Sequence, residues 1–77
     1  MPLPYLGTIR LLTDKYLDEG VTTGAIGTIL EVWGDGRYEV EFSNRETGET
    51  IAWFTAQEED LALVAPPGVG RLSRTGD

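Results

Sequence analysis

The stretch Ile26–Phe42 reads IGTILEVWGDGRYEVEF and decides the fold of this 77-residue chain. Two runs rich in β-branched and aromatic residues flank Gly34, Asp35 and Gly36, which readily adopt the positive φ of a tight reversal. The pattern predicts a β-hairpin with a three-residue loop. A two-residue loop would instead mix charged and apolar side chains on both faces of the hairpin, so we favour the longer loop.

This loop length sets the register of the hairpin. The predicted cross-strand pairs are Trp33–Arg37, Val32–Tyr38, Glu31–Glu39, Leu30–Val40, Ile29–Glu41 and Thr28–Phe42. One face then holds residues that all suit a core: Thr28, Leu30, Val32, Tyr38, Val40 and Phe42. The opposite face carries Ile29, Glu31, Trp33, Arg37, Glu39 and Glu41. The hairpin is therefore predicted to have one apolar face and one mainly acidic face.

The acidic face has two interpretations. Trp33 opposite Arg37 permits a cation–π contact, whereas Glu31 opposite Glu39 is a like-charge pair that costs from a few tenths to about 1 kcal/mol. The first interpretation is a solvated outer surface. The second is a patch that binds a basic partner through its carboxylates and an aromatic anchor.

Composition narrows the function classes. The chain has no cysteine and no histidine, which removes disulfides, thiol nucleophiles and the commonest general base. A single domain of this length has a small core and no evident deep cleft, so we expect no catalytic, metal or cofactor site. The longest apolar run, Leu61–Ala65, is too short to span a bilayer, and the N-terminus is not that of a signal peptide. A cytoplasmic location without membrane contact is expected.

The negative charge is unevenly distributed. Residues 1–65 contain twelve acidic and four basic residues, whereas residues 66–77 contain one acidic and two basic residues. An acidic domain of this kind repels phosphate backbones, so nucleic acid is not an expected partner. Pro66 and Pro67 mark the boundary, which divides the chain into a β-domain at 1–65 and a Pro/Gly/Arg tail at 66–77.

The remaining elements also read as strands. Tyr5–Leu12 is a predicted first strand, and its inward-facing residues are Tyr5, Gly7, Ile9 and Leu11. A long polar loop, Thr13–Ala25, leads to the hairpin. In the strand Thr50–Thr55 the alternation fails, because Ile51 and Trp53 occupy one face while Ala52 and Phe54 occupy the other. Which of Trp53 and Phe54 is buried stays open, and an exposed Trp53 joins the contact patch.

A short helical turn is predicted before the last strand. The spacing Thr55-Ala56-Gln57-Glu58 is that of a capping box, with Thr55 as the N-cap of a turn that carries Glu58, Glu59 and Asp60. The cap explains this acidic triplet without a metal ion. The strand Leu61–Val64 follows. Five mostly antiparallel strands and one helical turn in this order predict an all-β, SH3-like small barrel.

The pattern resembles a known bacterial family. The segments that carry the resemblance are Gly27–Val32, Asp35–Gly36, Tyr38–Phe42, Thr50–Ala52 and Glu59–Leu61. They are similar to the family catalogued as domain of unknown function 4926, over roughly Leu11 to Val64. The resemblance implies an SH3-like barrel and, for some members, a neighbouring small gene of the kind found in toxin–antitoxin or immunity pairs. Trp53-Phe54 departs from the smaller aliphatic residues common at those positions, which bears on the choice of partner.

These observations predict a non-catalytic acidic protein-binding module, an antitoxin or immunity-type inhibitor of a cognate protein. The predicted partner-binding residues are Glu31, Trp33, Arg37, Glu39, Glu41 and Trp53. The expected partner is a protein, a basic toxin encoded nearby being the leading case. The alternative is an accessory or self-associating subunit of an enzyme complex, because the strand pattern is also similar to the SH3-like barrel of the nitrile hydratase small subunit.

Overall fold

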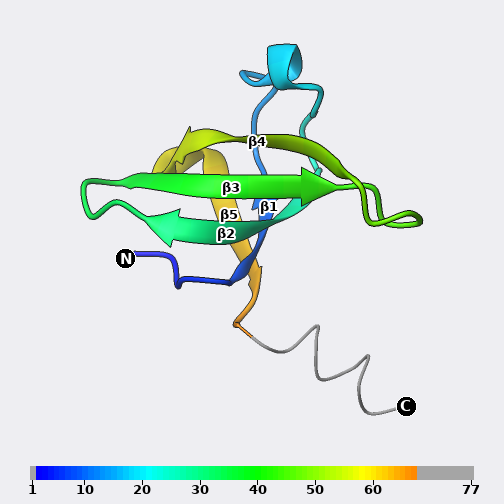
Figure 1. Cartoon of the computed structure of the whole chain (residues 1–77). Helices are drawn as coiled ribbons and strands as arrows, with labels where there is room; N and C mark the ends of the chain where they lie inside the picture. Colours follow the sequence, from blue (N-terminus) through cyan, green and yellow to red (C-terminus); the bar gives the residue numbers. More distant parts are fainter. Residues whose placement is uncertain (1, 68–77) are drawn as a thin grey trace, which may run out of the picture.

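The computed structural model describes residues 2–67 (Figure 1). Its strands are β1 (Thr8–Leu11), β2 (Ile26–Val32), β3 (Arg37–Ser43), β4 (Thr50–Gln57) and β5 (Leu61–Ala65). Two 3-10 turns are present, η1 (Leu17–Glu19) and η2 (Glu58–Asp60). The predicted all-β class, the five antiparallel strands and the short helical turn before the last strand are confirmed. Residues 68–77 of the predicted tail lie outside the described residues.

All five strands form one antiparallel sheet in the order β4-β3-β2-β1-β5. Figure 1 shows β1 and β5 running steeply behind β2, β3 and β4, so the sheet folds over on itself around its core. The core cluster takes side chains from every strand and one from the loop: Ile9, Leu11, Val21, Ile29, Tyr38, Val40, Phe42, Ala52, Phe54, Ala56 and Leu61. In this order β4 and β5 are the two edge strands of the described sheet.

The central hairpin has the predicted loop. Gly34 and Gly36 both have positive φ, at 91° and 86°, and the Trp33 N–H donates to the Arg37 carbonyl at 3.0 Å. Val32 pairs with Tyr38, and Glu31 pairs with Glu39, as the three-residue loop predicts. The glycines accept the left-handed backbone that the reversal requires.

Beyond Glu31 the predicted register is wrong, because β2 contains a bulge at Leu30. Ile29 pairs with Val40, not with Glu41, and Gly27 takes the predicted place of Thr28 opposite Phe42. A bulge inserts one unpaired residue and reverses the faces of the residues that follow it. Ile29 is consequently fully buried, whereas Leu30 and Thr28 are only half-buried.

Gly27 is required at its position by close packing. A Cβ added there would lie 2.6 Å from the Glu41 carbonyl oxygen and 2.7 Å from Cδ2 of Phe42. The Phe42 ring therefore occupies the space beside the Gly27 backbone, and it also stacks on Phe54 with ring centroids 5.6 Å apart. A glycine inside a strand often marks such a close approach.

The first strand is shorter than predicted. The Gly7 N–H donates to the Pro4 carbonyl at 2.9 Å, and Leu6 has a φ of 67°, so the chain turns before Thr8. Gly7, Ile9 and Leu11 are buried as predicted. Tyr5 is 56% exposed, and its assignment to the core face is wrong because it lies within this turn and not in the strand.

The predicted capping box before the last strand is wrong. Strand β4 continues to Gln57, which puts Thr55 inside the strand, and Gln57 is the N-cap residue of η2 without a side-chain cap bond. The Thr55 hydroxyl instead donates to Glu39 of the neighbouring strand. Phe54 is buried and Trp53 is 58% exposed, which settles the alternative that the sequence leaves open.

Candidate protein-binding face

Strand β3 provides the centre of the candidate site. Tyr38, Val40 and Phe42 are buried, so alternation along the strand turns Arg37, Glu39 and Glu41 to the outer side of the sheet. The three predicted β3 residues therefore project from one face, spaced two residues apart. A straight strand separates such neighbours by about 6.5–7 Å.

The neighbouring strands bring the other predicted residues to the same face. Glu31 of β2 lies directly opposite Glu39, and Trp53 of β4 lies directly opposite Glu41. Trp33 follows β2 and is bonded through its N–H to Arg37. We call the set Glu31, Trp33, Arg37, Glu39, Glu41 and Trp53 the acidic face. Its two tryptophans are 51% and 58% exposed, which is unusual for side chains of this size.

The backbone bonds show which cross-strand pairs are close. The Arg37 carbonyl accepts from Trp33 on the β2 side, and the Gln57 N–H turns away from β3 to donate to the Tyr16 hydroxyl at 3.3 Å. Along an antiparallel strand, the N–H and C=O groups of successive residues point alternately to the two neighbouring strands. The pairs Glu41–Trp53 and Glu39–Thr55 are therefore of the narrow, non-hydrogen-bonded type, with Cα atoms about 4.5 Å apart. Glu31–Glu39 is of the wide type, which reduces the repulsion between its carboxylates.

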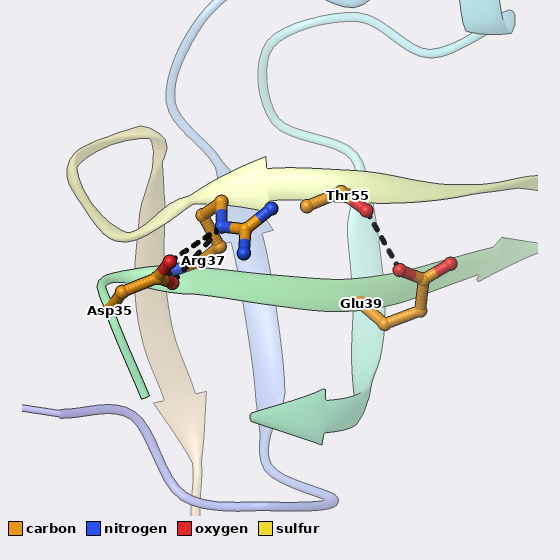
Figure 2. Close-up of polar contacts among 4 residues, drawn as sticks. All are labelled: Asp35, Arg37, Glu39 and Thr55. Carbon is orange, nitrogen blue, oxygen red and sulfur yellow. Dashed lines mark hydrogen bonds and ion pairs between the residues drawn. The ribbon is translucent and has the colours of Figure 1, made fainter. Parts of the chain in front are cut away.

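The cation of the acidic face is already paired. The Arg37 Nε donates to both carboxylate oxygens of Asp35, at 3.0 Å and 2.9 Å (Figure 2). The predicted cation–π contact between Trp33 and Arg37 is wrong, since within residues 2–67 such a contact joins only Lys15 and Tyr16. Asp35 reaches the guanidinium because it lies two residues before Arg37, in the loop that joins β2 to β3.

Threonine hydroxyls of β4 hold two of the carboxylates. Figure 2 shows the Thr55 hydroxyl donating to Oε1 of Glu39, at 2.8 Å. The Thr50 hydroxyl donates to Oε2 of Glu41 at 2.6 Å. Both are charge-assisted bonds, which fix the orientation of a side chain that would otherwise be free. The acidic face is therefore a partly ordered array of carboxylates.

A second polar cluster was not predicted. The Asp60 carboxylate is buried, and its Oδ2 accepts a hydrogen bond from the Tyr16 hydroxyl at 2.7 Å and contacts the Lys15 ammonium at 2.8 Å. We call Lys15, Tyr16 and Asp60 the polar latch. The sequence offers one indication of this cluster, because Lys15, the sole lysine of the chain, precedes a tyrosine in an acidic loop. Sequence spacing does not show that this loop meets η2.

The latch contains two groups with raised pKa values, Lys15 and Tyr16. The hydrogen bond to Asp60 raises the pKa of Lys15 above its ordinary value of 10.5. Burial, followed by the hydrogen bond to Asp60, raises the pKa of Tyr16 above 10.0. Both groups are protonated at neutral pH, and their contacts with the Asp60 carboxylate join the loop to η2.

A shallow groove of about 340 Å³ lies between the loop that precedes β2 and the turn that joins β3 to β4. Its lining includes the apolar residues Val21, Ile26, Phe42 and Ile51 and the charged residues Arg45 and Glu46. The acidic face contributes no residue to its lining. Among residues 2–67 no three potential metal ligands lie together, and no helix is long and apolar enough to cross a membrane.

The fold and the acidic face define a small all-β domain that carries its candidate site on a sheet surface. The chain belongs to the family described as Domain of unknown function (DUF4926), whose model matches residues 6–63. This match confirms the family inferred from the strand and turn pattern. No curated protein and no solved structure matches the chain significantly.

Proposed function

We propose that this protein is a non-catalytic module that binds a basic protein through the acidic face, as an antitoxin or immunity-type inhibitor binds its cognate protein. One observation carries the proposal: three carboxylates share the outer side of the sheet with two half-exposed tryptophans, while the local cation Arg37 is bound by Asp35. Stability alone does not favour placing Glu31 opposite Glu39.

In the proposed binding mode, the carboxylates attract the partner and the tryptophans provide apolar contact area. The acidic face attracts a basic patch and accelerates association, an effect that weakens as salt screens the charges. Trp33 and Trp53 then lose exposed apolar surface against the partner and act as anchors. Inhibition follows from coverage, because a basic active or nucleic-acid-binding surface under this face is no longer accessible.

The test is a pull-down from lysate of the source cells with two baits, the native protein and a Trp33→Ala/Glu39→Lys variant, at low and high salt. We expect one small basic protein to bind the native bait, to be lost at high salt and to be absent from the variant. Circular dichroism must show that the variant is folded. Equal recovery by both baits would refute binding through this face.

The inhibitory role needs a separate readout. The captured protein is expressed alone and together with the native chain or the double variant. We expect growth arrest by the captured protein alone, with rescue by the native chain and no rescue by the variant. A captured protein that is harmless when expressed alone would contradict the antitoxin assignment and leave the binding role intact.

The second candidate is an accessory or self-associating subunit. The observation that favours it is strand β4, an edge strand whose eight residues include no charged side chain. Edge strands are usually protected from pairing by charges or proline. Sedimentation equilibrium across a hundredfold concentration range tests this candidate, and a constant monomer mass would exclude self-association in that range.

A further inference from the structure

The pair Glu41 and Trp53 is a distinct feature within the acidic face. The two residues are directly opposite each other on β3 and β4, in the narrow type of antiparallel pair. Their Cβ atoms are consequently about 4.5–5.5 Å apart on the same side of the sheet. A tryptophan that is 58% exposed thus lies opposite a glutamate at the edge of the sheet.

The Glu41 carboxylate is held in place but not saturated. Its Oε2 accepts the Thr50 hydroxyl at 2.6 Å, and within residues 2–67 no salt bridge reaches Oε1. The neighbour on its other side is Thr28, an uncharged residue. The site therefore offers one oriented acceptor oxygen opposite a tryptophan that is more than half exposed.

This combination matches a guanidinium group better than an ammonium group. Guanidinium is planar, weakly hydrated and able to stack on an indole while its edge donates to a carboxylate. A lysine ammonium is compact and strongly hydrated, so it gains the charge attraction but little stacking. A phosphate or another carboxylate would be repelled by Glu41.

We propose that the Glu41–Trp53 pair is an arginine-binding site, which receives an arginine side chain of the partner. The proposal rests on the proposed function and specifies its partner: the basic surface that docks on the acidic face presents an arginine at β4, with the guanidinium stacked on Trp53 and bonded to Glu41. Glu31 and Glu39 supply attraction to either kind of cation.

The test uses two blocked peptides, acetyl-hexaarginine amide and acetyl-hexalysine amide, titrated into the intact protein. Affinity is measured by calorimetry at low and moderate salt, and the Trp53 indole N–H is followed by NMR. We expect the arginine peptide to bind about three- to tenfold more tightly and to shift the Trp53 signal more than the lysine peptide does.

Four variants identify the groups responsible. Trp53→Ala and Glu41→Gln are each expected to reduce the arginine preference to less than about twofold. Glu46→Gln removes an equal charge from the β3–β4 turn, and Trp33→Ala removes the other tryptophan of the acidic face. Both controls are expected to weaken the two peptides equally and to keep the preference.

The outcomes separate this inference from the proposed function. Salt-sensitive binding of both peptides with equal affinity would overturn the arginine site and leave the acidic face as a general basic surface receptor. An arginine preference that survives in Trp53→Ala would also overturn the assignment. Absence of binding by either peptide at low salt would contradict both proposals.

Discussion

The ammonium of Lys15 lies 2.8 Å from the Oδ2 atom of Asp60, and this contact joins the long loop to the turn before the last strand. The two ends of the contact differ in exposure, since the Lys15 side chain is 46% exposed and the Asp60 side chain is 8% exposed. The Leu12 N–H also donates to the Asp60 carbonyl at 2.9 Å. The loop is therefore fixed to η2 by both side-chain and backbone groups.

Replacement of Lys15 by methionine should destabilise the fold. The variant keeps the aliphatic stem but leaves the buried Asp60 carboxylate with the Tyr16 hydroxyl and without its cation. We expect the free energy of unfolding, measured by urea denaturation, to fall clearly because the buried Asp60 carboxylate loses its cation. Asp35→Asn breaks the exposed pair with Arg37 and should cost less than about 1 kcal/mol. Equal losses in the two variants would contradict the structural role of the latch.

The contact between Lys15, Tyr16 and Asp60 should also make the stability of the fold depend on pH in the alkaline range. The pKa values of Lys15, Tyr16 and Tyr38, which lies outside the latch, are raised in the folded protein, so the folded state holds protons that the unfolded state releases above about pH 10. The stabilisation by these groups is complete below pH 10 and is lost as pH rises further. Urea midpoints between pH 7 and pH 11 should therefore decline only above pH 10. The decline should be shallower in Lys15→Met, and an identical decline would argue against the latch as its source.

Gly27→Ala should disturb the core although it adds one methyl group. The new Cβ would overlap the Glu41 carbonyl and the Phe42 ring, so strands β2 and β3 must separate locally. We expect a loss of about 1–3 kcal/mol in the free energy of unfolding. The adjacent Thr28→Ala changes a half-buried residue without such overlap and should cost less than about 1 kcal/mol. A neutral Gly27→Ala would mean that the Phe42 ring can move aside.

Tyr38→Phe tests how the N-terminal segment is attached. The buried Tyr38 hydroxyl accepts the Leu3 N–H at 2.9 Å and donates to Glu58 at 3.1 Å. Its loss should cost about 1–2 kcal/mol and should accelerate hydrogen exchange of the Leu3 amide. Tyr5→Phe, at an exposed position, is the matched control and should change neither quantity. Unchanged exchange at Leu3 in Tyr38→Phe would refute this attachment.

Local patterns were sufficient to predict the hairpin but not its full register. Glycines and β-branched residues identify the loop and the strands on either side, and the pairs next to the loop follow from its length. The bulge at Leu30 leaves no mark in the alternation, because Thr28, Leu30 and Val32 also form an acceptable apolar set. The prediction therefore placed Leu30 in the core where the structure has Ile29.

The acidic face could be anticipated because its β3 residues alternate with the core residues of the same strand. The hydrogen bonds that its carboxylates accept could not be predicted. The capping-box pattern assigned Thr55 to a helical turn, whereas the strand extends past it and its hydroxyl binds Glu39. The latch between Lys15 and Asp60 depends on how the chain folds back between distant segments, which a one-dimensional pattern does not contain.

The bulge at Leu30 reverses which residues of β2 point into the core. Before it, the odd-numbered Gly27 and Ile29 point inward; after it, the odd-numbered Glu31 and Trp33 point outward. A single strand thus supplies side chains to the interior before the bulge and to the acidic face after it. Substitutions in Glu31–Gly36 therefore change the outer surface of the sheet, while the packing around Ile29 stays as it is.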